Sequence, residues 1–256
     1  MRMKIIVTAG PTREYLDPVR FLSNPSTGKM GFAIAAEAAR RGHEVTLIAG
    51  PVALKTPNRV HRVDVTSARE MLAAVKTAVA DGRKLLLRSL RTNTCASFVR
   101  TSASSAVAVS DSSIVVISTA AVADWRPAKC AAKKLKKSQM SGTLKLVRNP
   151  DILKTIAGLR RGRSPRPTVA GLKLVGFAAE TDHVLSEAAR KCREKGLSFI
   201  VANDVTRKGC GFGTDTNRVA FVFPDGTQKR FPLMTKRMVA KRVLDEVSSE
   251  AAGREG

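Results

Sequence analysis

The sequence predicts an α/β fold, with a Rossmann-like, mostly parallel sheet flanked by helices and a small β-hairpin late in the chain. Three observations support this prediction. Short apolar runs alternate with helical patterns over residues 1–80, which is typical of right-handed βαβ crossovers. The first run ends in a glycine turn ahead of a helix. Hydrophobic residues make up 43% of 256 residues but aromatic residues only 4%, and an aliphatic core suits a parallel sheet better than a β-sandwich.

The first third of the chain supplies this alternation. The elements expected there are strands at Lys4–Thr8, Glu44–Ile48 and Val60–Val65 and helices at 28–41 and 67–80. Ser26 or Thr27 is predicted to cap the first helix, and Gly42 closes it. Ser67 and Glu70 have the spacing of a capping box at the second helix. The glycine turn after the first strand therefore lies at the carboxyl edge of the sheet, where such folds bind ligands.

Residues 81–112 break the pattern. About thirty residues in one connection is long for a compact domain, where links usually run about 4–6 residues. We interpret this segment as a mobile, basic insertion within a single domain over residues 1–250, and residues 251–256 as a disordered tail.

The alternation resumes after this segment. The strands expected there are Ser113–Ser118, Thr143–Val147, Leu172–Ala178 and Phe199–Ala202, with helices over 182–195 and 235–248. A further helix is predicted to begin with Asn149 as its cap and Pro150 at its first position. Arg218–Phe223 and Gln228–Pro232 flank a Pro-Asp-Gly-Thr turn, which predicts a hairpin.

The net charge and the cysteine pattern indicate which classes of partner and which compartment to expect. A formal net charge of +24 predicts a surface that attracts anions. With one Trp and one Tyr, few rings are available to stack bases, which disfavours a nucleic-acid partner. The four cysteines show no C-x-x-C pair, and neither a secretory signal nor an apolar run of membrane length is found. These features predict a cytoplasmic protein that does not bind membranes.

The stretch from Thr8 to Gly31 has the layout of an anion site. A strand enters a loop and then a helix, whose first N–H groups have no partner within the helix. Gly28 and Gly31 allow close approach of a ligand and of the neighbouring strand. The spacing is neither the dinucleotide fingerprint nor a Walker A loop. Phosphate is the expected guest, and an ordinary glycine turn of an α/β domain is the alternative.

Further polar groups follow later strands. Asp124, Glu180 and the pair Asn203-Asp204 come after three successive strands. Each could be a helix cap or a turn residue, but their repetition favours a site at the carboxyl edge of the sheet. The three histidines have no ligand spacing, and no metal ligands are assigned.

Two groups of lysines could meet an anionic ligand. Lys191 and Lys195 are four residues apart on a predicted helix and point the same way, although Glu187 could pair with Lys191 on a solvated face. The four lysines at 133, 134, 136 and 137 could fold over a triphosphate or form a solvated basic loop.

Seven motifs occur here in the order found in phosphopantothenate–cysteine ligases, the phosphopantothenoylcysteine synthetases of coenzyme A biosynthesis. They are Thr8–Arg13, Asp17–Gly31, Ala120–Pro127, Lys134–Lys137, Arg148–Ile152, Gly176–Thr181 and Ala202–Asp204. The chain resembles the bacterial type over nearly its whole length except 81–112, as a standalone form without the flavin-dependent decarboxylase domain. Arg148 stands where lysine is common in the family, which keeps the charge but changes its geometry.

This resemblance implies a two-step ligation. The carboxylate of 4′-phosphopantothenate attacks the α-phosphate of a nucleoside triphosphate, CTP or ATP with CTP favoured, and pyrophosphate leaves. The amine of L-cysteine then attacks the acyl-nucleotide. Because anion meets anion, Mg²⁺ and fixed cations are implied. The resemblance also implies a homodimer with its active site near the subunit interface, and the 218–232 hairpin is a candidate dimer element.

The resemblance assigns residues as well. Asn24 would hold the acyl-nucleotide through its side-chain amide, and Lys134 would contact phosphate, so both are expected to be catalytic. The nucleotide contacts implied are Gly10, Ser26, Gly28, Asp124, Phe177, Lys191 and Lys195. The substrate contacts implied are Arg20, Asn24, Ala120 and Ala121.

Two other classes of function stay open at this point. One is an NAD(P)-dependent reductase on a Rossmann-like sheet, which the missing G-x-G-x-x-G disfavours. The other is a basic nucleic-acid-binding module, suggested by the net charge of +24 and the basic segment 81–112.

Overall fold

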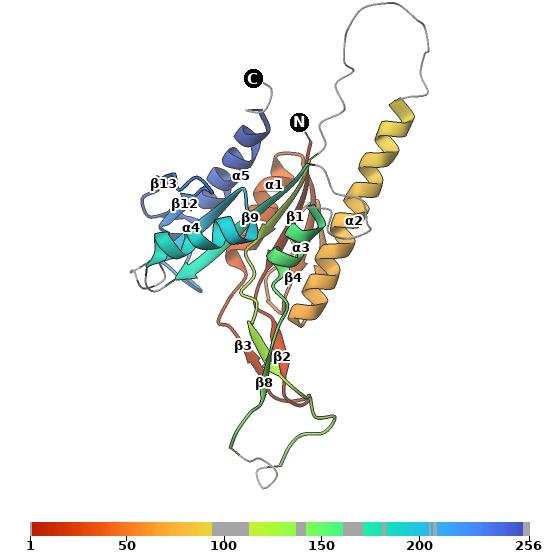
Figure 1. The fold of residues 1–256 in the computed structure, drawn as a ribbon, viewed down its shortest axis with the longest axis vertical. Helices are drawn as coiled ribbons and strands as arrows, with labels where there is room; N and C mark the ends of the chain where they lie inside the picture. The colour runs from red at the N-terminus through yellow and green to blue at the C-terminus, as the bar shows by residue number, and fades with distance from the viewer. Residues whose placement is uncertain are drawn as a thin grey trace, which may run out of the picture.

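An eight-stranded sheet forms the centre of the computed structural model, which describes residues 2–93, 113–136, 142–160, 171–180, 183–204, 206 and 209–252 (Figure 1). In spatial order the strands are β5 (Val60–Asp64), β4 (Glu44–Ala49), β1 (Lys4–Ala9), β6 (Ile114–Ser118), β9 (Leu172–Glu180), β10 (Phe199–Asp204), β12 (Val219–Val222) and β13 (Gln228–Arg230). The first six are parallel, and the β12–β13 hairpin adds two antiparallel strands at one edge. This is the Rossmann strand order, so the predicted fold and hairpin are confirmed.

Helices cover both faces of the sheet. α1 (Lys29–Arg40) and α5 (Lys236–Ala252) pack on one face, and α2 (Ala68–Asn93), α3 (Ile152–Arg160) and α4 (Val184–Lys195) pack on the other. Consecutive residues of β1 enter opposite cores, with Ile5 and Val7 on the α1 side and Ile6 on the α2 side. A strand covered on both faces must be apolar at every position, which explains the aliphatic runs in the sequence.

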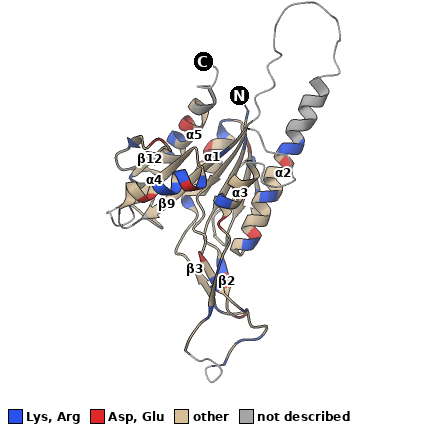
Figure 2. Cartoon of the chain, in the orientation of Figure 1, with Lys and Arg blue, Asp and Glu red and all other residues tan. Residues whose placement is uncertain are grey.

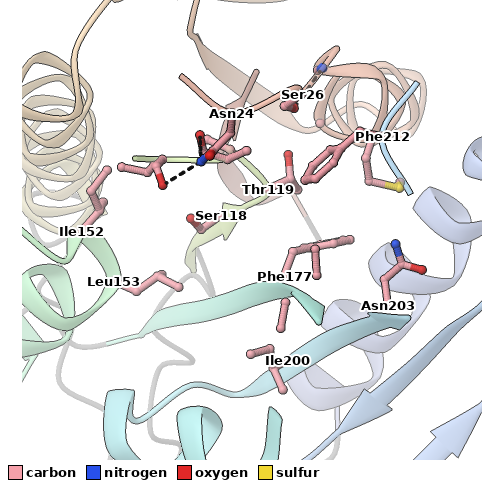
Figure 3. A pocket seen from close by; sticks show the side chains of 18 of the residues that line it. Asn24, Ser26, Ser118, Thr119, Ile152, Leu153, Phe177, Ile200, Asn203 and Phe212 are labelled. Atoms are coloured by element: carbon pink, nitrogen blue, oxygen red, sulfur yellow. Dashed lines mark hydrogen bonds between the residues drawn. The ribbon is translucent and has the colours of Figure 1, made fainter. Parts of the chain in front are cut away.

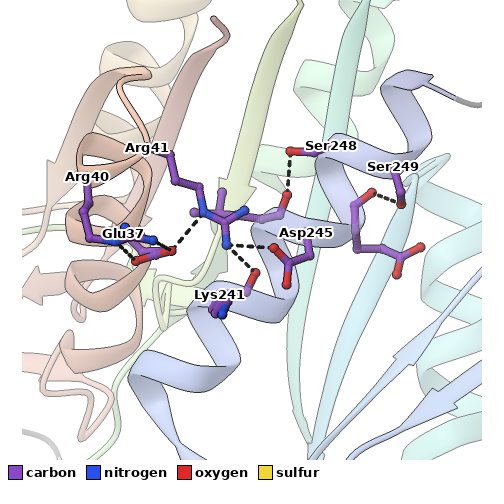
Figure 4. A network of polar contacts seen from close by, with 9 residues as sticks. Glu37, Arg40, Arg41, Lys241, Asp245, Ser248 and Ser249 are labelled. Carbon is purple, nitrogen blue, oxygen red and sulfur yellow. Dashed lines mark hydrogen bonds and ion pairs between the residues drawn. The ribbon is translucent and has the colours of Figure 1, made fainter. Parts of the chain in front are cut away.

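Two helices are joined by a buried ionic network (Figure 4). Glu37 of α1 is 6% exposed and accepts two hydrogen bonds of 2.7 Å from Arg40 and one of 2.9 Å from Arg41. Arg41 continues to Asp245 of α5 at 2.8 Å and to the Lys241 carbonyl at 3.1 Å. The Arg40 guanidinium, together with Arg41, lowers the pKa of Glu37 to about 2, despite the opposing effect of burial. The buried carboxylate is therefore ionised and paired, which fixes α1 against α5.

An arm projects from the carboxyl edge of the sheet (Figure 1). It consists of two small hairpins, β2 (Arg13–Tyr15) with β3 (Phe21–Ser23) and β7 (Trp125–Pro127) with β8 (Leu146–Arg148), and of the loop 128–136. The Ala123 N–H donates to Thr12 Oγ1 at 3.0 Å, which ties the two hairpins together. The sequence predicted an extended loop before α1 and a strand at Thr143–Val147. The first prediction missed the β2–β3 hairpin, and the second placed β8 too early.

The predicted helix end at Ala80 is wrong, because α2 continues to Asn93. The chain from Asp81 onward was predicted to be a connection, but a Cβ on Gly82 would come within 2.8 Å of Lys4 Cδ and 3.0 Å of Ile114 Cδ1. Gly82 therefore permits close packing of helix on sheet. Residues 94–112 lie outside the described part of the chain, so their role as an insertion stays a prediction. α5 reaches Ala252, two residues into the predicted tail, and residues 253–256 are not described.

Two predicted helix caps are also corrected. α1 is capped by Gly28, in the left-handed region, with no side-chain hydrogen bond, rather than by Ser26 or Thr27. α3 begins at Ile152, and Asp151 Oδ1 accepts the Lys154 N–H at 2.9 Å, so Asp151 takes the place predicted for Asn149. The Ser67–Glu70 capping box of α2 is confirmed by bonds of 3.3 and 3.0 Å. Within the described ranges, no helix has the length and apolar character needed to cross a bilayer.

Candidate functional site

A cavity of about 600 Å³ opens at the carboxyl edge of the sheet, where the chain crosses from one side of β1 to the other (Figure 3). Its walls come from the loop before α1, the residues after β6, the start of α3, the middle of β9, the face of α4 and the loop 211–217. Parallel sheets bind ligands at this topological switch point. Six chain segments that are distant in the sequence therefore meet around one space.

The start of α1 forms one wall. Gly28 has a φ of 77°, and its N–H donates to Ser26 Oγ at 3.3 Å. A Cβ on Gly31 would lie 2.5 Å from both Ala9 Cβ and Thr119 Oγ1, so only glycine lets the first turn approach the sheet this closely. Because no side chain caps this helix, its first N–H groups are available to an anion.

Asn24 lies across the cavity from α3 (Figure 3). Its Nδ2 donates to the carbonyls of Ala121 and Val122 at 3.2 and 3.3 Å. The Ala121 N–H in turn donates to Gly10 O at 2.9 Å. The predicted donation from Asn24 to an acyl-nucleotide therefore requires exchange of one of these long bonds, while the present bonds fix the orientation of the amide.

Four lysines from three helices line the cavity: Lys29, Lys191, Lys195 and Lys236. Lys195 pairs with Asp151 at 2.8 Å. Burial by itself would raise the pKa of Asp151, but the Lys154 N–H and the Lys195 ammonium lower it. Glu187 pairs with Arg190 at 2.7 Å.

Lys29 and Lys236 hold the loop 211–217 against the cavity. Lys29 Nζ lies 2.8 Å from Asp215 Oδ1 and 2.9 Å from Gly213 O. Lys236 is 8% exposed and donates to Gly211 O at 3.3 Å. Burial, with the nearby Lys29 ammonium, lowers the pKa of Lys236. So much positive charge around one space is suited to a polyanion.

The far end of the cavity holds two aromatic rings and two amides. Phe177 of β9 and Phe212, which is 45% exposed, both line it. Asn217, in the short strand β11 (Thr216–Asn217) that pairs with β14 (Met234–Thr235), accepts the Gly211 N–H at 3.3 Å. Asn203 of β10 is 8% exposed, and its Oδ1 has no hydrogen-bond partner. A buried amide oxygen without a partner is costly, and Asn203 is one of the residues that line this end of the cavity.

The structure brings together most of the predicted site. The predicted residues that line the cavity are Asn24, Ser26, Gly28, Ala120, Ala121, Asp124, Phe177, Lys191 and Lys195. Gly10 is not among the lining residues but lies directly behind Gly28, where a Cβ would be 3.4 Å from Gly10 N. Arg20 and Lys134 are on the arm and do not line this cavity.

Sequence reasoning missed Lys29, Phe212, Asn217 and Lys236 in the cavity wall. The only local signal for Phe212 and Asn217 is the glycine-rich run at 209–213, followed by Asp215. Such a run predicts a loop but not the helix ends to which it is tied.

Acidic side chains are few at the cavity, and charged residues of both signs are spread over the helices. Among the described residues, no three His, Cys, Asp or Glu side chains gather as a metal site. Asp124 and Asp151 are the acidic side chains at the cavity in that part of the chain. Figure 2 shows Lys and Arg on α2, α4, α5 and the arm, interspersed on the helices with Asp and Glu.

Comparison with known proteins gives concordant matches. A family model described as DNA/pantothenate metabolism flavoprotein C-terminal domain matches residues 1–87 and 92–251. The chain is 43% identical over 248 residues to the coenzyme A biosynthesis bifunctional protein CoaBC of Escherichia coli (strain K12), covering 96% of this chain and 51% of that protein. The CoaBC protein of Bacillus subtilis (strain 168) is 39% identical over 246 residues, covering 96% and 51% respectively.

A solved structure agrees with these matches. The crystal structure of the C-terminal domain of coenzyme A biosynthesis bifunctional protein CoaBC has a TM-score of 0.69 and 36% identity, and the match covers 98% of this chain and 96% of that one. The chain thus spans about half the length of the curated relatives it matches and nearly all of that solved domain.

Proposed function

The chain belongs to the family of the DNA/pantothenate metabolism flavoprotein C-terminal domain, and from this membership and the cavity we propose that it is a phosphopantothenate–cysteine ligase of coenzyme A biosynthesis. It joins 4′-phosphopantothenate to L-cysteine and cleaves a nucleoside triphosphate to the monophosphate and pyrophosphate. The single observation that carries this proposal is the cavity with four lysines and an open helix N-terminus, in a domain 36% identical to the CoaBC C-terminal domain.

The cavity provides for the nucleotide of this reaction. The triphosphate lies at the start of α1 and along α4, where the first turn of α1 offers N–H donors and Lys191 and Lys195 offer ammonium groups. The nucleoside occupies the end of the cavity lined by Phe177 and Asn203. CTP is the proposed nucleotide, with ATP as the alternative. Mg²⁺ would be held chiefly by the phosphates and would neutralise part of their charge, because no three His, Cys, Asp or Glu side chains of the described residues gather into a protein cage.

The two chemical steps take place near Asn24. The pantothenate carboxylate displaces pyrophosphate from the α-phosphorus, and the resulting acyl-nucleotide lies between Asn24 and the Ala120-Ala121 main chain. The cysteine amine then attacks the acyl carbon, the amide bond forms, and the nucleoside monophosphate leaves with the acyl–oxygen electron pair. Asp124 lies beside this wall and orients the substrates. Localised positive charge at the leaving groups supplies most of the acceleration.

A turnover assay tests the function. We expect continuous pyrophosphate release only when magnesium, 4′-phosphopantothenate and cysteine are all present, with CTP turned over faster than ATP, GTP or UTP. Mass spectrometry should identify 4′-phosphopantothenoyl-L-cysteine as the product. Absence of this product with all four nucleotides would overturn the proposal. The cytoplasm is the proposed site of action, since the three described cysteines, Cys130, Cys192 and Cys210, form no disulfide.

We propose that the protein acts as a homodimer in which the arm of one subunit reaches the cavity of the other. Lys134 does not line the cavity of its own chain. The arm also carries most of the exposed large apolar side chains of the described chain, namely Val19, Phe21, Trp125, Leu144 and Leu146. By contrast, the edge strand of the 218–232 hairpin exposes Gln228, Lys229 and Arg230, and charged edges oppose pairing. We therefore place the dimer contact on the arm rather than on the predicted hairpin.

Oligomeric state tests this arrangement. Trp125 is 45% exposed on the arm and Met238 is 51% exposed on α5. We expect Trp125→Glu to shift the protein from dimer to monomer and to abolish ligation, because a charge replaces buried apolar area at the contact. Met238→Glu should remain dimeric and active. Light scattering after gel filtration measures both variants, and a Trp125→Glu protein that is still dimeric would contradict an arm-mediated contact.

A further inference from the structure

A buried carboxylate lies in the turn between β2 and β3. The side chain of Asp17 is 0% exposed although the turn is at the surface of the arm. Its Oδ1 accepts the N–H groups of Val19 and Arg20, each at 2.9 Å. Its Oδ2 accepts Arg20 Nε at 3.0 Å and Nη2 at 2.5 Å. The two oxygens thus do different work, since Oδ1 closes the turn and Oδ2 holds the guanidinium.

The same pair reaches across to the lysine-rich loop. Leu135 donates its N–H to Asp17 Oδ2 at 3.2 Å, and its carbonyl accepts Arg20 Nη2 at 3.0 Å. Both main-chain polar groups of Leu135, its N–H and its carbonyl, are therefore hydrogen-bonded to the Asp17–Arg20 pair. Earlier in the loop, the Ala131 N–H donates to Leu16 O at 2.8 Å. The loop is attached to the turn at two points, and Lys133 and Lys134 lie between them.

Attachment of the loop to the turn offsets two unfavourable free-energy terms of the folded loop. Lys133, Lys134 and Lys136 are close in sequence, and ammonium groups held together repel. Fixing a flexible loop also costs conformational entropy, which must be met either before or during ligand binding. Because the Asp17–Arg20 pair fixes the loop before a ligand binds, this entropy is lost on folding and not on binding. The guanidinium of Arg20 holds the pKa of Asp17 well below its usual range despite burial, so the carboxylate stays charged at any pH at which the enzyme would work.

We propose that Asp17 is a positioning residue for the ligation, which acts through Arg20 and the Leu135 peptide to hold Lys134 in place for the anionic substrates. This inference rests on the proposed function for the role of Lys134 in catalysis, but the attachment itself does not. We call Asp17 and Arg20, which together bind the main chain of Leu135, the clamp. Arg20, which the resemblance assigned to the substrate, is the second residue of this clamp.

Asp17→Asn tests the clamp selectively. The remaining amide oxygen can still accept the Val19 and Arg20 N–H groups, while the NH₂ group replaces Oδ2 and can no longer accept from Leu135 or Arg20. We expect trypsin to cleave after Lys133, Lys134 and Lys136 at least about tenfold faster than in the wild type, because the loop opens more often. Mass spectrometry of the peptides ending at these residues measures the rate. Arg20→Lys, which keeps the charge but loses the fork, should act in the same direction.

A matched control separates the clamp from general loss of stability. Glu37→Gln alters another buried carboxylate with two arginine partners, Arg40 and Arg41 at the end of the same helix, of which Arg41 also pairs with Asp245 of α5. It should lower the melting temperature without a change in cleavage of the loop at fixed temperature well below melting. Loop cleavage that is unchanged in both Asp17→Asn and Arg20→Lys would overturn the proposal.

A double-mutant cycle tests the link to catalysis. If Asp17 acts through Lys134, Asp17→Asn should lower kcat/KM in the wild-type background by about tenfold or more and have little further effect on Lys134→Ala. Independent, additive effects would overturn the positioning role. Should the wild type show no ligation at all, the proposed function fails, while the trypsin measurement still decides whether the clamp exists.

Discussion

Asn24→Ala is expected to lower the steady-state rate of ligation by about 10²–10³-fold, the usual cost of removing one donor aimed at developing charge. The amide of Asn24 is held at the cavity wall by the Ala121 and Val122 carbonyls, so it is oriented before substrate binds. In the proposed reaction, one N–H of the Asn24 amide exchanges its carbonyl partner for the acyl-nucleotide. There it donates a hydrogen bond to the oxygen on which negative charge grows as the cysteine amine attacks. Without that donor the second step slows more than the first.

Rapid-quench kinetics can distinguish the two steps. The variant should release about one equivalent of pyrophosphate per site in the first turnover and then stall, with acyl-nucleotide accumulating. Asn24→Asp should be equally impaired, since it has nearly the same shape but loses both donors and places a carboxylate against two carbonyls. Asn58→Ala, at an exposed turn position, is the control and should turn over normally. Unimpaired turnover of Asn24→Ala would remove this role.

Much of the site could be predicted because it follows the periodicity of the chain. The strands of a parallel sheet are apolar at every position, and the residues just after them share one edge. That rule, with the family resemblance, placed Asn24, Asp124 and Phe177 in one region, and the cavity contains all three. Helical spacing placed Lys191 and Lys195 on one face of a helix, but only the family resemblance assigned that face to the nucleotide.

What could not be predicted depends on contacts between distant segments. Nothing in the sequence around Lys29 distinguishes it from other helix residues. Its place in the cavity wall is fixed by its bond to Asp215, a residue 186 positions away. Arg20 looks like a cation available for substrate until its bond to the Leu135 carbonyl, 115 positions away, is seen. Local patterns carry no information on such pairs, so neither the bond between Arg20 and Leu135 nor the place of the loop 211–217 in the cavity wall could be predicted.

Gly50→Ala is expected to have the largest effect on the fold of the site. Gly50 follows β4, and its N–H donates to Ala9 O at 2.9 Å. A Cβ there would lie 1.7 Å from Pro11 O and 2.8 Å from Pro11 C. These are main-chain atoms, so no side-chain rotation can relieve the clash, and the Gly10–Pro11 turn must move. Pro11 also bridges to Ala121, the residue that accepts the Asn24 amide. The methyl group would therefore disturb both the sheet edge and the wall of the cavity.

We expect Gly50→Ala to lose about 3 kcal/mol of unfolding free energy or more, as overpacked cores do, which for a chain of this size lowers the melting temperature by about 6–12 °C. Nucleotide binding should weaken as well, because the displaced turn lies behind Gly28. Gly158→Ala is the matched control, since no atom lies within 4 Å of a Cβ at that position of α3, and alanine in a helix should stabilise by about 0.5–1 kcal/mol. Thermal unfolding and CTP titration measure the two effects. If Gly50→Ala melted with the wild type, the contact between Gly50 and Pro11 would not be as close as the structure has it, and the position of the turn behind the phosphate site would have to be revised.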